Sequence, residues 1–111
     1  IPGDQLNPKH GKSDVLEIMT DAFGIYDISV TMKSDLDSLA QLPISVFLDN
    51  TFRTTITVQG SQGKTVVRSQ ELGRVFGRNH YLKLYYGADG MDIQEIRLRY
   101  AKPLERPKQN G

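Results

Sequence analysis

The chain has 111 residues, of which 38% are hydrophobic and 24% charged, so it is long enough for one domain and too apolar for a disordered segment. It has no cysteine and two histidines, which excludes a disulfide framework and a thiolate zinc site and argues against a histidine-rich metal site. The net charge is +1, and residues 14–101 alone carry −2, so we expect no nucleic-acid partner. No apolar run approaches the ~20 residues of a membrane helix, so we expect no membrane partner.

The two ends of the chain are rich in proline, glycine and polar residues. Residues 1–13 contain two prolines and two glycines without apolar periodicity, and residues 102–111 have the same character. Such composition is typical of loops and linkers. We therefore expect an N-terminal linker over residues 1–13, a β-sandwich domain over residues 14–101 and a C-terminal tail over residues 102–111.

Between these ends, apolar and polar residues alternate. Every second residue from Tyr26 to Met32 is apolar, which is the pattern of a strand with one buried face. The same period returns along the chain, and polar or glycine-containing turns interrupt it, for example at Asp49 and Asn50. Residues 36–42 carry the spacing of one helical turn at most, and we expect a loop there. We expect strands at residues 15–19, 25–33, 44–48, 52–58, 65–67, 72–76, 80–86 and 96–100.

Short strands at about ten-residue spacing, joined by turns, are typical of a sandwich or a small barrel. We therefore expect an all-β fold, a jelly-roll β-sandwich of about eight short antiparallel strands. The residues expected in its core are Ile28, Val30, Val46, Leu48, Ile56, Leu82, Leu84 and Leu98. The aromatic residues expected at the core margins are Tyr26, Phe47, Phe52 and Phe76.

No arrangement of residues predicts catalysis. The chain lacks cysteine and a G-x-S-x-G motif, and its two histidines lie in unlike contexts, so we expect no nucleophilic catalysis. The closest acidic pairs, among them Asp89 with Asp92, lie in polar loops, where acidic residues usually form solvated turns. We therefore expect that the chain is not an enzyme.

Tyr81, Tyr85 and Tyr86 form the densest aromatic cluster of the chain. In a strand, Tyr86 falls on the buried side with Leu84, whereas Tyr81 and Tyr85 share the other side at a spacing of ~13 Å. Such a face can stack on planar or ring-shaped ligands, or a flanking strand or another domain can cover it. The pattern leaves both alternatives open.

The loop over residues 87–92 is the surface that we rank first as a ligand site. Its glycines let the backbone approach a ligand, and its two aspartates offer charge-assisted acceptors for hydroxyl pairs. A plain hairpin loop with solvated acids is the alternative. The surface ranked next is the exposed face that carries Tyr81 and Lys83. The predicted ligand-binding residues are Tyr85, Tyr86, Asp89 and Asp92.

Three places in the chain carry a family resemblance. They are DAFGIYDI at residues 21–28, ISVFLDN at residues 44–50, and GRNHYLKL at residues 77–84, which is followed by GMDIQEI at residues 90–96. These segments and the order of the strands resemble the family-six-type carbohydrate-binding modules and related jelly rolls of bacterial polysaccharide-degrading enzymes. The chain departs from that family in having no tryptophan, and in having Asp92 where the family has the asparagine that hydrogen-bonds the sugar.

The resemblance implies a non-catalytic carbohydrate-binding module that targets a glycan-active enzyme to its polysaccharide or oligosaccharide. The partner would be the catalytic domain of a parent enzyme, and the location would be secreted, periplasmic or at the cell surface. A structural calcium stays open, because the leading segment that supplies a ligating glutamate in many members is short here; no other cofactor is expected.

Two alternative functions remain at this point. One is a structural accessory β-sandwich domain that packs against a glycoside hydrolase catalytic domain without binding sugar, and the missing tryptophan favours it. The other is a nucleic-acid-binding barrel, which disagrees with the net charge of residues 14–101.

Overall fold

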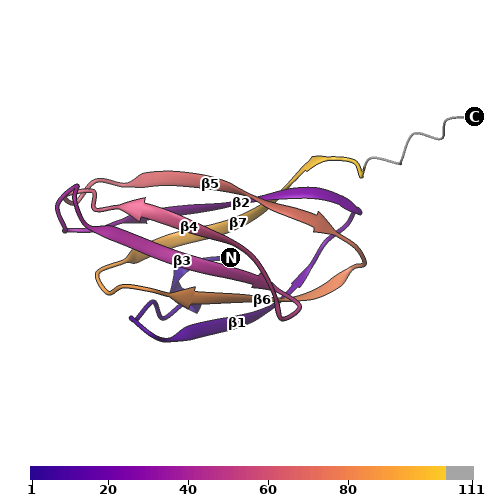
Figure 1. Ribbon diagram of the computed structural model, residues 1–111, viewed down its shortest axis with the longest axis horizontal. Helices are drawn as coiled ribbons and strands as arrows, with labels where there is room; N and C mark the ends of the chain where they lie inside the picture. The colour runs from indigo at the N-terminus through magenta and orange to yellow at the C-terminus, as the bar shows by residue number, and fades with distance from the viewer. Residues whose placement is uncertain (105–111) are drawn as a thin grey trace, which may run out of the picture.

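The computed structural model of the chain describes residues 1–104 (Figure 1). Residues 105–111, which make up most of the expected tail, lie outside the described residues. No helix in the described part is long and apolar enough to cross a membrane. The elements are the 3₁₀ turn η1 (Gly3–Gln5) and the strands β1 (Ser13–Met19), β2 (Gly24–Lys33), β3 (Gln41–Leu48), β4 (Thr51–Gln59), β5 (Val66–Val75), β6 (Asn79–Tyr86) and β7 (Asp92–Lys102).

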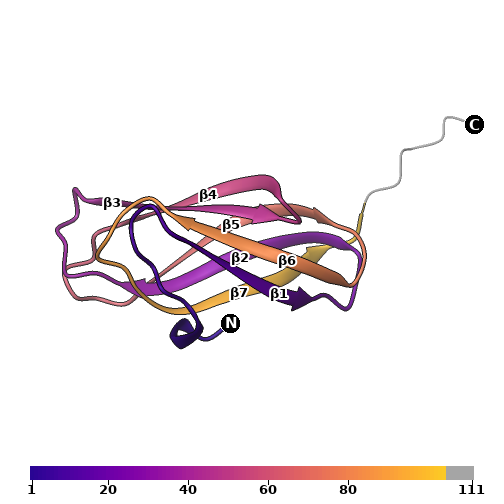
Figure 2. The same cartoon turned by 90° about the horizontal axis from the view of Figure 1, so that it is seen from below.

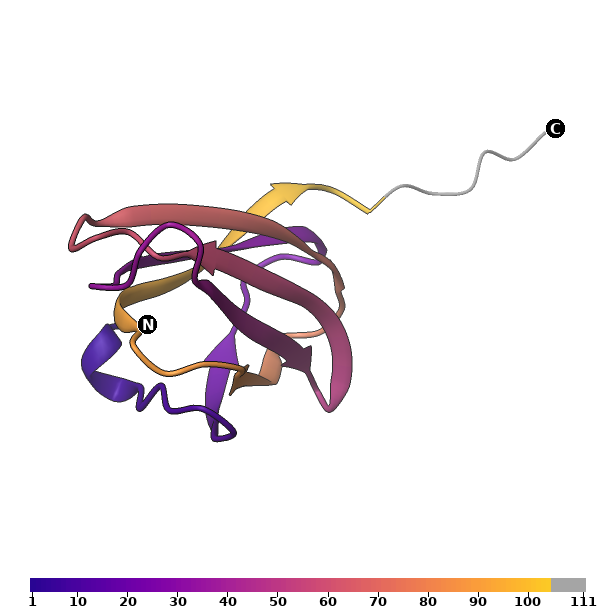
Figure 3. The same cartoon turned by 60° about the vertical axis from the view of Figure 1, so that its left-hand side comes forward.

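The strands form two antiparallel sheets that enclose one core. One sheet has the order β1-β6-β3-β4, and the other has the order β5-β2-β7. Several sheet neighbours are therefore far apart in sequence, as is usual when the chain crosses between the layers of a jelly roll. Figure 3 shows the two sheets curving around a single interior. The expected all-β jelly-roll sandwich is confirmed.

The described residues form seven strands rather than the expected eight, because the strands expected at residues 65–67 and 72–76 are the two ends of the single strand β5. This strand pairs with β2 along its whole length. It is an edge strand, and residues 67–71 are exposed on both of its faces. Since neither face is buried there, the sequence lacks the alternation that marks a strand.

Seven of the eight residues expected in the core are buried, and Leu98 is half-buried because it lines a hollow between the free edges of β1 and β7. Of the aromatic residues expected at the margins, Tyr26 is buried and Phe47 is half-buried. Phe52 and Phe76 are exposed. The period-two pattern thus identified the inward face of β2, β3 and β6 and of the second half of β4 correctly. At the start of β4 a register shift in the pairing with β3 turns Phe52 outward, against the predicted alternation.

The N-terminal residues pack against the sandwich and do not form the expected linker. The Ile1 amino group donates to the Ile96 oxygen at 2.8 Å, and the Ile96 N–H donates back to the Ile1 oxygen at 3.0 Å. Leu6 is buried in the core, and η1 lies beside β7 (Figure 2). This irregular segment covers part of the free edge of β7, a role that leaves no periodic signal in the sequence.

Candidate functional site

The structure separates the two tyrosines that precede the loop over residues 87–92. Tyr85 lies on the outer face of the four-stranded sheet and is 40% exposed. Tyr86 points inward and is fully buried, and its hydroxyl donates to Asp14 Oδ2 at 2.6 Å. Burial and the neighbouring carboxylate raise the pKa of the Tyr86 phenol far above its usual range. Tyr86 is therefore a core residue, because successive side chains of a strand point to opposite faces.

The loop over residues 87–92 lies at the end of β6, and both of its aspartates are exposed. Asp89 Oδ1 accepts the His10 N–H at 2.8 Å, and Asp92 forms an ion pair with Lys33 at 3.8 Å. A hollow of about 250 Å³ beside the loop includes Asp92, but its lining includes neither Asp89 nor an aromatic ring. The lining residues are Lys33, Ser34, Asp35, Gly90, Met91 and Asp92.

Exposed aromatic rings gather instead on the outer face of the sheet β1-β6-β3-β4, which we call the aromatic face. Its rings are those of Tyr81, Tyr85, Phe47 and Phe52. The two phenylalanines stand opposite each other on β3 and β4, with ring centroids 5.6 Å apart, edge to face. Lys83 lies between the two tyrosines on β6 and places its Nζ 5.2 Å above the Phe47 ring. The aromatic face therefore combines apolar planes with a cation.

The aromatic face ends in a hollow of about 410 Å³ beside Tyr81, which is 56% exposed. Glu17 of β1 stands opposite Tyr81 of β6, and Met19 stands opposite Asn79. A carboxylate, an amide and an aromatic plane thus open into one depression. The lining residues are Glu17, Ile18, Met19, Asn79, His80 and Tyr81.

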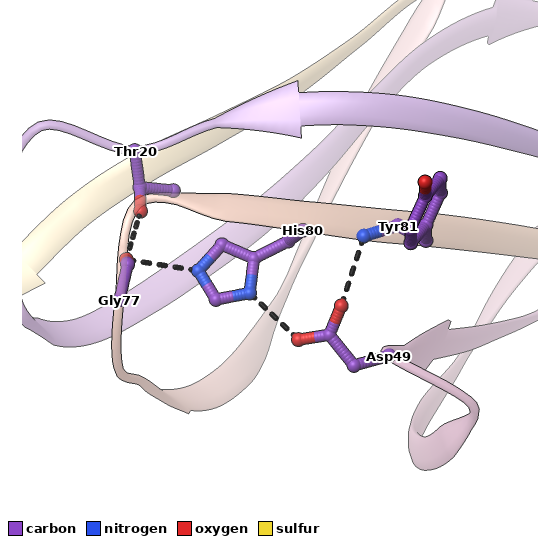
Figure 4. A network of polar contacts seen from close by, with 5 residues as sticks. All are labelled: Thr20, Asp49, Gly77, His80 and Tyr81. Carbon is purple, nitrogen blue, oxygen red and sulfur yellow. Dashed lines mark hydrogen bonds and ion pairs between the residues drawn. The ribbon is translucent and has the colours of Figure 1, made fainter.

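A hydrogen-bonded network holds this end of β6 in place (Figure 4). His80 is buried, with Nδ1 2.7 Å from Asp49 Oδ2 and Nε2 2.9 Å from the Gly77 oxygen. The Tyr81 N–H donates to Asp49 Oδ1 at 2.9 Å. Thr20 Oγ1 donates to the same Gly77 oxygen at 3.0 Å. We call these five residues the His80 clasp.

The hairpin turn between β3 and β4 explains how Asp49 reaches the clasp. Asp49 and Asn50 both have positive φ, at 50° and 66°, as a two-residue turn of type I′ requires. Aspartate and asparagine tolerate this conformation better than other non-glycine residues. The expected turn at these residues is confirmed, and the same Asp49 serves as the acceptor for His80.

The electrostatics of the clasp follow from its hydrogen bonds. Burial lowers the pKa of His80, but the bonds to Asp49 and to the Gly77 oxygen raise it by more, so the net pKa lies above the ordinary value of 6.5. The bonds from His80 and from the Tyr81 N–H hold the pKa of Asp49 below its ordinary value of 3.8.

This network was not predicted from the sequence. A signal was present, because His80 occupies the inward register of β6 with Leu82 and Leu84, and a buried imidazole needs hydrogen-bond partners. The identity of the partners came only from the fold. Within residues 1–104, no group of three or more histidine, aspartate or glutamate side chains is arranged to hold a metal ion.

Comparison with known proteins identifies structures that share this fold. No family model matches the chain. A β-glucosidase of Ruminococcus albus is 34% identical over 83 residues, which are 75% of this chain and only 9% of that protein. A family 35 carbohydrate-binding module from an environmental isolate superimposes with a TM-score of 0.70 at 16% identity, covering 89% of this chain and 74% of the module. The C-terminal family 6 module of a marine laminarinase from Zobellia galactanivorans superimposes with a TM-score of 0.68 at 22% identity, covering 81% of this chain and 73% of that module. The chain therefore has the jelly-roll fold of the family 6 and family 35 carbohydrate-binding modules.

Proposed function

We propose that the chain is a non-catalytic carbohydrate-binding module that attaches a glycan-active parent enzyme to its polysaccharide. The observation that carries the proposal is the pair of exposed rings, Tyr81 and Tyr85, on one strand of a face that also offers hydrogen-bonding groups. The shared fold with carbohydrate-binding modules supports it. One fold can host many functions, so the evidence for sugar binding comes from the side chains of the aromatic face.

The chemistry of the aromatic face suits a sugar chain. Aromatic planes pack against the apolar faces of sugar rings, while amide and carboxylate groups such as those of Asn79 and Glu17 bond hydroxyls. Tyr81 and Tyr85 are four residues apart on β6, which separates them by ~13 Å. Rings at that spacing cannot stack on the same sugar ring, so we propose an extended oligosaccharide segment as the ligand.

The loop over residues 87–92 is the second candidate surface. Asp89 and Asp92 stay exposed and keep oxygens free for hydroxyl groups, although each already has a partner in His10 or Lys33. The loop and the hollow at Tyr81 lie at opposite ends of β6 (Figure 1). Substitutions can therefore distinguish the two surfaces.

The parent would supply the catalysis. The β-glucosidase that matches this chain does so over a small part of its length, as expected for an accessory module beside a larger catalytic region. We propose that the module itself is not an enzyme and acts outside the cell or at its surface.

The test is a glycan array followed by calorimetric titration of the best ligand. Tyr81→Ala and Tyr85→Ala should each weaken binding about 10- to 150-fold, because burial of an aromatic side chain contributes about 1.5–3 kcal/mol. Tyr100→Ala is the matched control, since Tyr100 is 43% exposed on the opposite sheet, and it should leave the affinity unchanged.

Three outcomes would contradict the proposal or its site. Loss of binding in Asp89→Ala or Asp92→Ala, with no change in the tyrosine variants, moves the site to the loop. Loss in Tyr100→Ala alone moves it to the other sheet. If the glycan array shows no binding to plant, algal or animal polysaccharides, glycan binding is refuted. That result supports an accessory domain whose aromatic face packs against the catalytic domain.

A further inference from the structure

Both ring nitrogens of His80 face oxygen atoms that can only accept. Nδ1 lies 2.7 Å from Asp49 Oδ2, and Nε2 lies 2.9 Å from the main-chain oxygen of Gly77. A neutral imidazole carries one N–H, so one of its nitrogens would point a lone pair at an oxygen. We infer that His80 is a doubly protonated imidazolium that joins the turn after β3 to the connection before β6 and positions Tyr81 on the aromatic face. The positioning part of this inference rests on the proposed function.

The alternative in which Asp49 carries the proton does not fit the contacts. Both Asp49 oxygens accept, one from His80 and the other from the Tyr81 N–H. Its side chain is 49% exposed, so water stabilises the ionised form on the open side. The bonded carboxylate also has a pKa below its ordinary value. The proton between these residues therefore belongs to the histidine.

The clasp joins parts of the chain that are far apart in sequence. Asp49 comes from the turn between β3 and β4, Gly77 from the connection between β5 and β6, and Thr20 from the connection between β1 and β2. Thr20 also donates its N–H to the Arg78 oxygen at 2.8 Å. One N–H of His80 therefore ties the start of β6 to the turn after β3, and the other binds the Gly77 oxygen, to which Thr20 after β1 also donates.

Tyr81 is tied to the clasp through its backbone. The Asp49 N–H donates to the Tyr81 oxygen, and Asp49 Oδ1 accepts the Tyr81 N–H, both at 2.9 Å. The carboxylate that binds His80 is therefore the same group that fixes the Tyr81 main chain. Loss of the imidazolium charge would weaken the hold on Asp49 and free the Tyr81 end of the aromatic face.

The charges around His80 give the sign of the pH dependence. Asp49 faces it from the turn after β3 and favours the charged ring, whereas Arg53 of β4 opposes it. Glu17 of β1 lines the hollow beside it. Because the folded pKa of His80 is raised, the ring is charged below pH 6.5 and loses its proton as the pH rises through the folded pKa. The hydrogen bonds of the His80 clasp should therefore weaken as the pH rises above the pKa of His80.

The experiment is an NMR titration of the His10→Gln chain, in which His80 is the single remaining histidine. At pH 6, both ring nitrogens should carry an observable proton and show imidazolium shifts. The titration midpoint should lie above 6.5, and the backbone amide of Tyr81 should shift with the same midpoint. In Asp49→Asn, which retains an acceptor for the Tyr81 N–H, the midpoint of His80 should fall.

The outcomes separate this inference from the proposed function. A single ring N–H at pH 6, or a midpoint below 6.5, overturns the imidazolium. A Tyr81 amide that does not respond when the ring titrates overturns the positioning role. Neither NMR measurement requires a ligand, so both tests remain valid if the glycan screen finds no binding. If a glycan is found, its affinity should fall between pH 6 and pH 9 in the wild type and change less in Asp49→Asn.

Discussion

The hydrogen bond between Tyr86 and Asp14 allows a sharp test of the core. Tyr86→Phe keeps the buried ring and removes only the hydroxyl that donates to Asp14 Oδ2 at 2.6 Å. A hydrogen bond to a charged group contributes about 1.5–3 kcal/mol. Asp14 is half-buried and also accepts the Asn7 N–H at 2.8 Å, so water and this second donor compensate part of the loss. We expect the free energy of unfolding to fall by about 1.5 kcal/mol, the lower end of that range.

Urea unfolding followed by circular dichroism measures this loss, and an unchanged m value would show that the unfolding transition is the same. Asp14→Ala and the double variant complete a mutant cycle, with an expected coupling energy of about 0.5–3 kcal/mol between the two side chains. A coupling energy near zero would refute the reasoning. A lower glycan affinity in a stable Tyr86→Phe variant would instead return Tyr86 to the binding site, where the sequence analysis placed it.

Three further predictions concern stability. Leu84→Ala should lower the free energy of unfolding by about 2–5 kcal/mol, because the side chain is fully buried in the middle of β6. A smaller change in urea unfolding would mean that the surrounding residues collapse into the cavity. Gly60→Ala should destabilise by at least about 1–3 kcal/mol, because its Cβ would lie 1.9 Å from the Asp37 main-chain oxygen; a thermal midpoint equal to wild type would contradict this close approach. The free energy of unfolding should fall as the pH rises above 6.5, because His80 has a raised pKa in the folded state and loses its proton there. It should also fall as the pH drops below 3.8, because Asp49 has a lowered pKa and becomes protonated. In His80→Gln the loss of stability above pH 6.5 should be smaller.

The inward faces of β2 and β6 could be predicted from the sequence. Ile28 and Val30 in β2, and Leu82 and Leu84 in β6, are buried as the alternation indicates. The same rule already placed Tyr86 on the buried side, so its inclusion among the ligand-binding residues conflicted with the pattern. Burial on one face of a strand is a local property, because successive side chains point to opposite sides.

The irregular and edge segments could not be predicted in this way. Residues 1–12 pack against the sandwich without any periodic pattern, and the polar middle of β5 pairs with β2 while both of its faces are exposed. In both places backbone hydrogen bonds, which nearly every residue type can make, form much of the contact, and Leu6 adds a single buried side chain in the N-terminal segment. Side-chain composition therefore carries little information about them.

Alternation and turn preference act over a few neighbouring residues, so they sufficed to predict the fold class, the core faces of the main strands and the turn at Asp49 and Asn50. The contacts of Asp49 with His80, 31 residues away, and of Asp14 with Tyr86, 72 residues away, depend instead on how the whole chain folds. Both contacts exist because β6 lies between β1 and β3 in one sheet. Strand order is set by how the two layers pack around the whole core, and no local pattern specifies it.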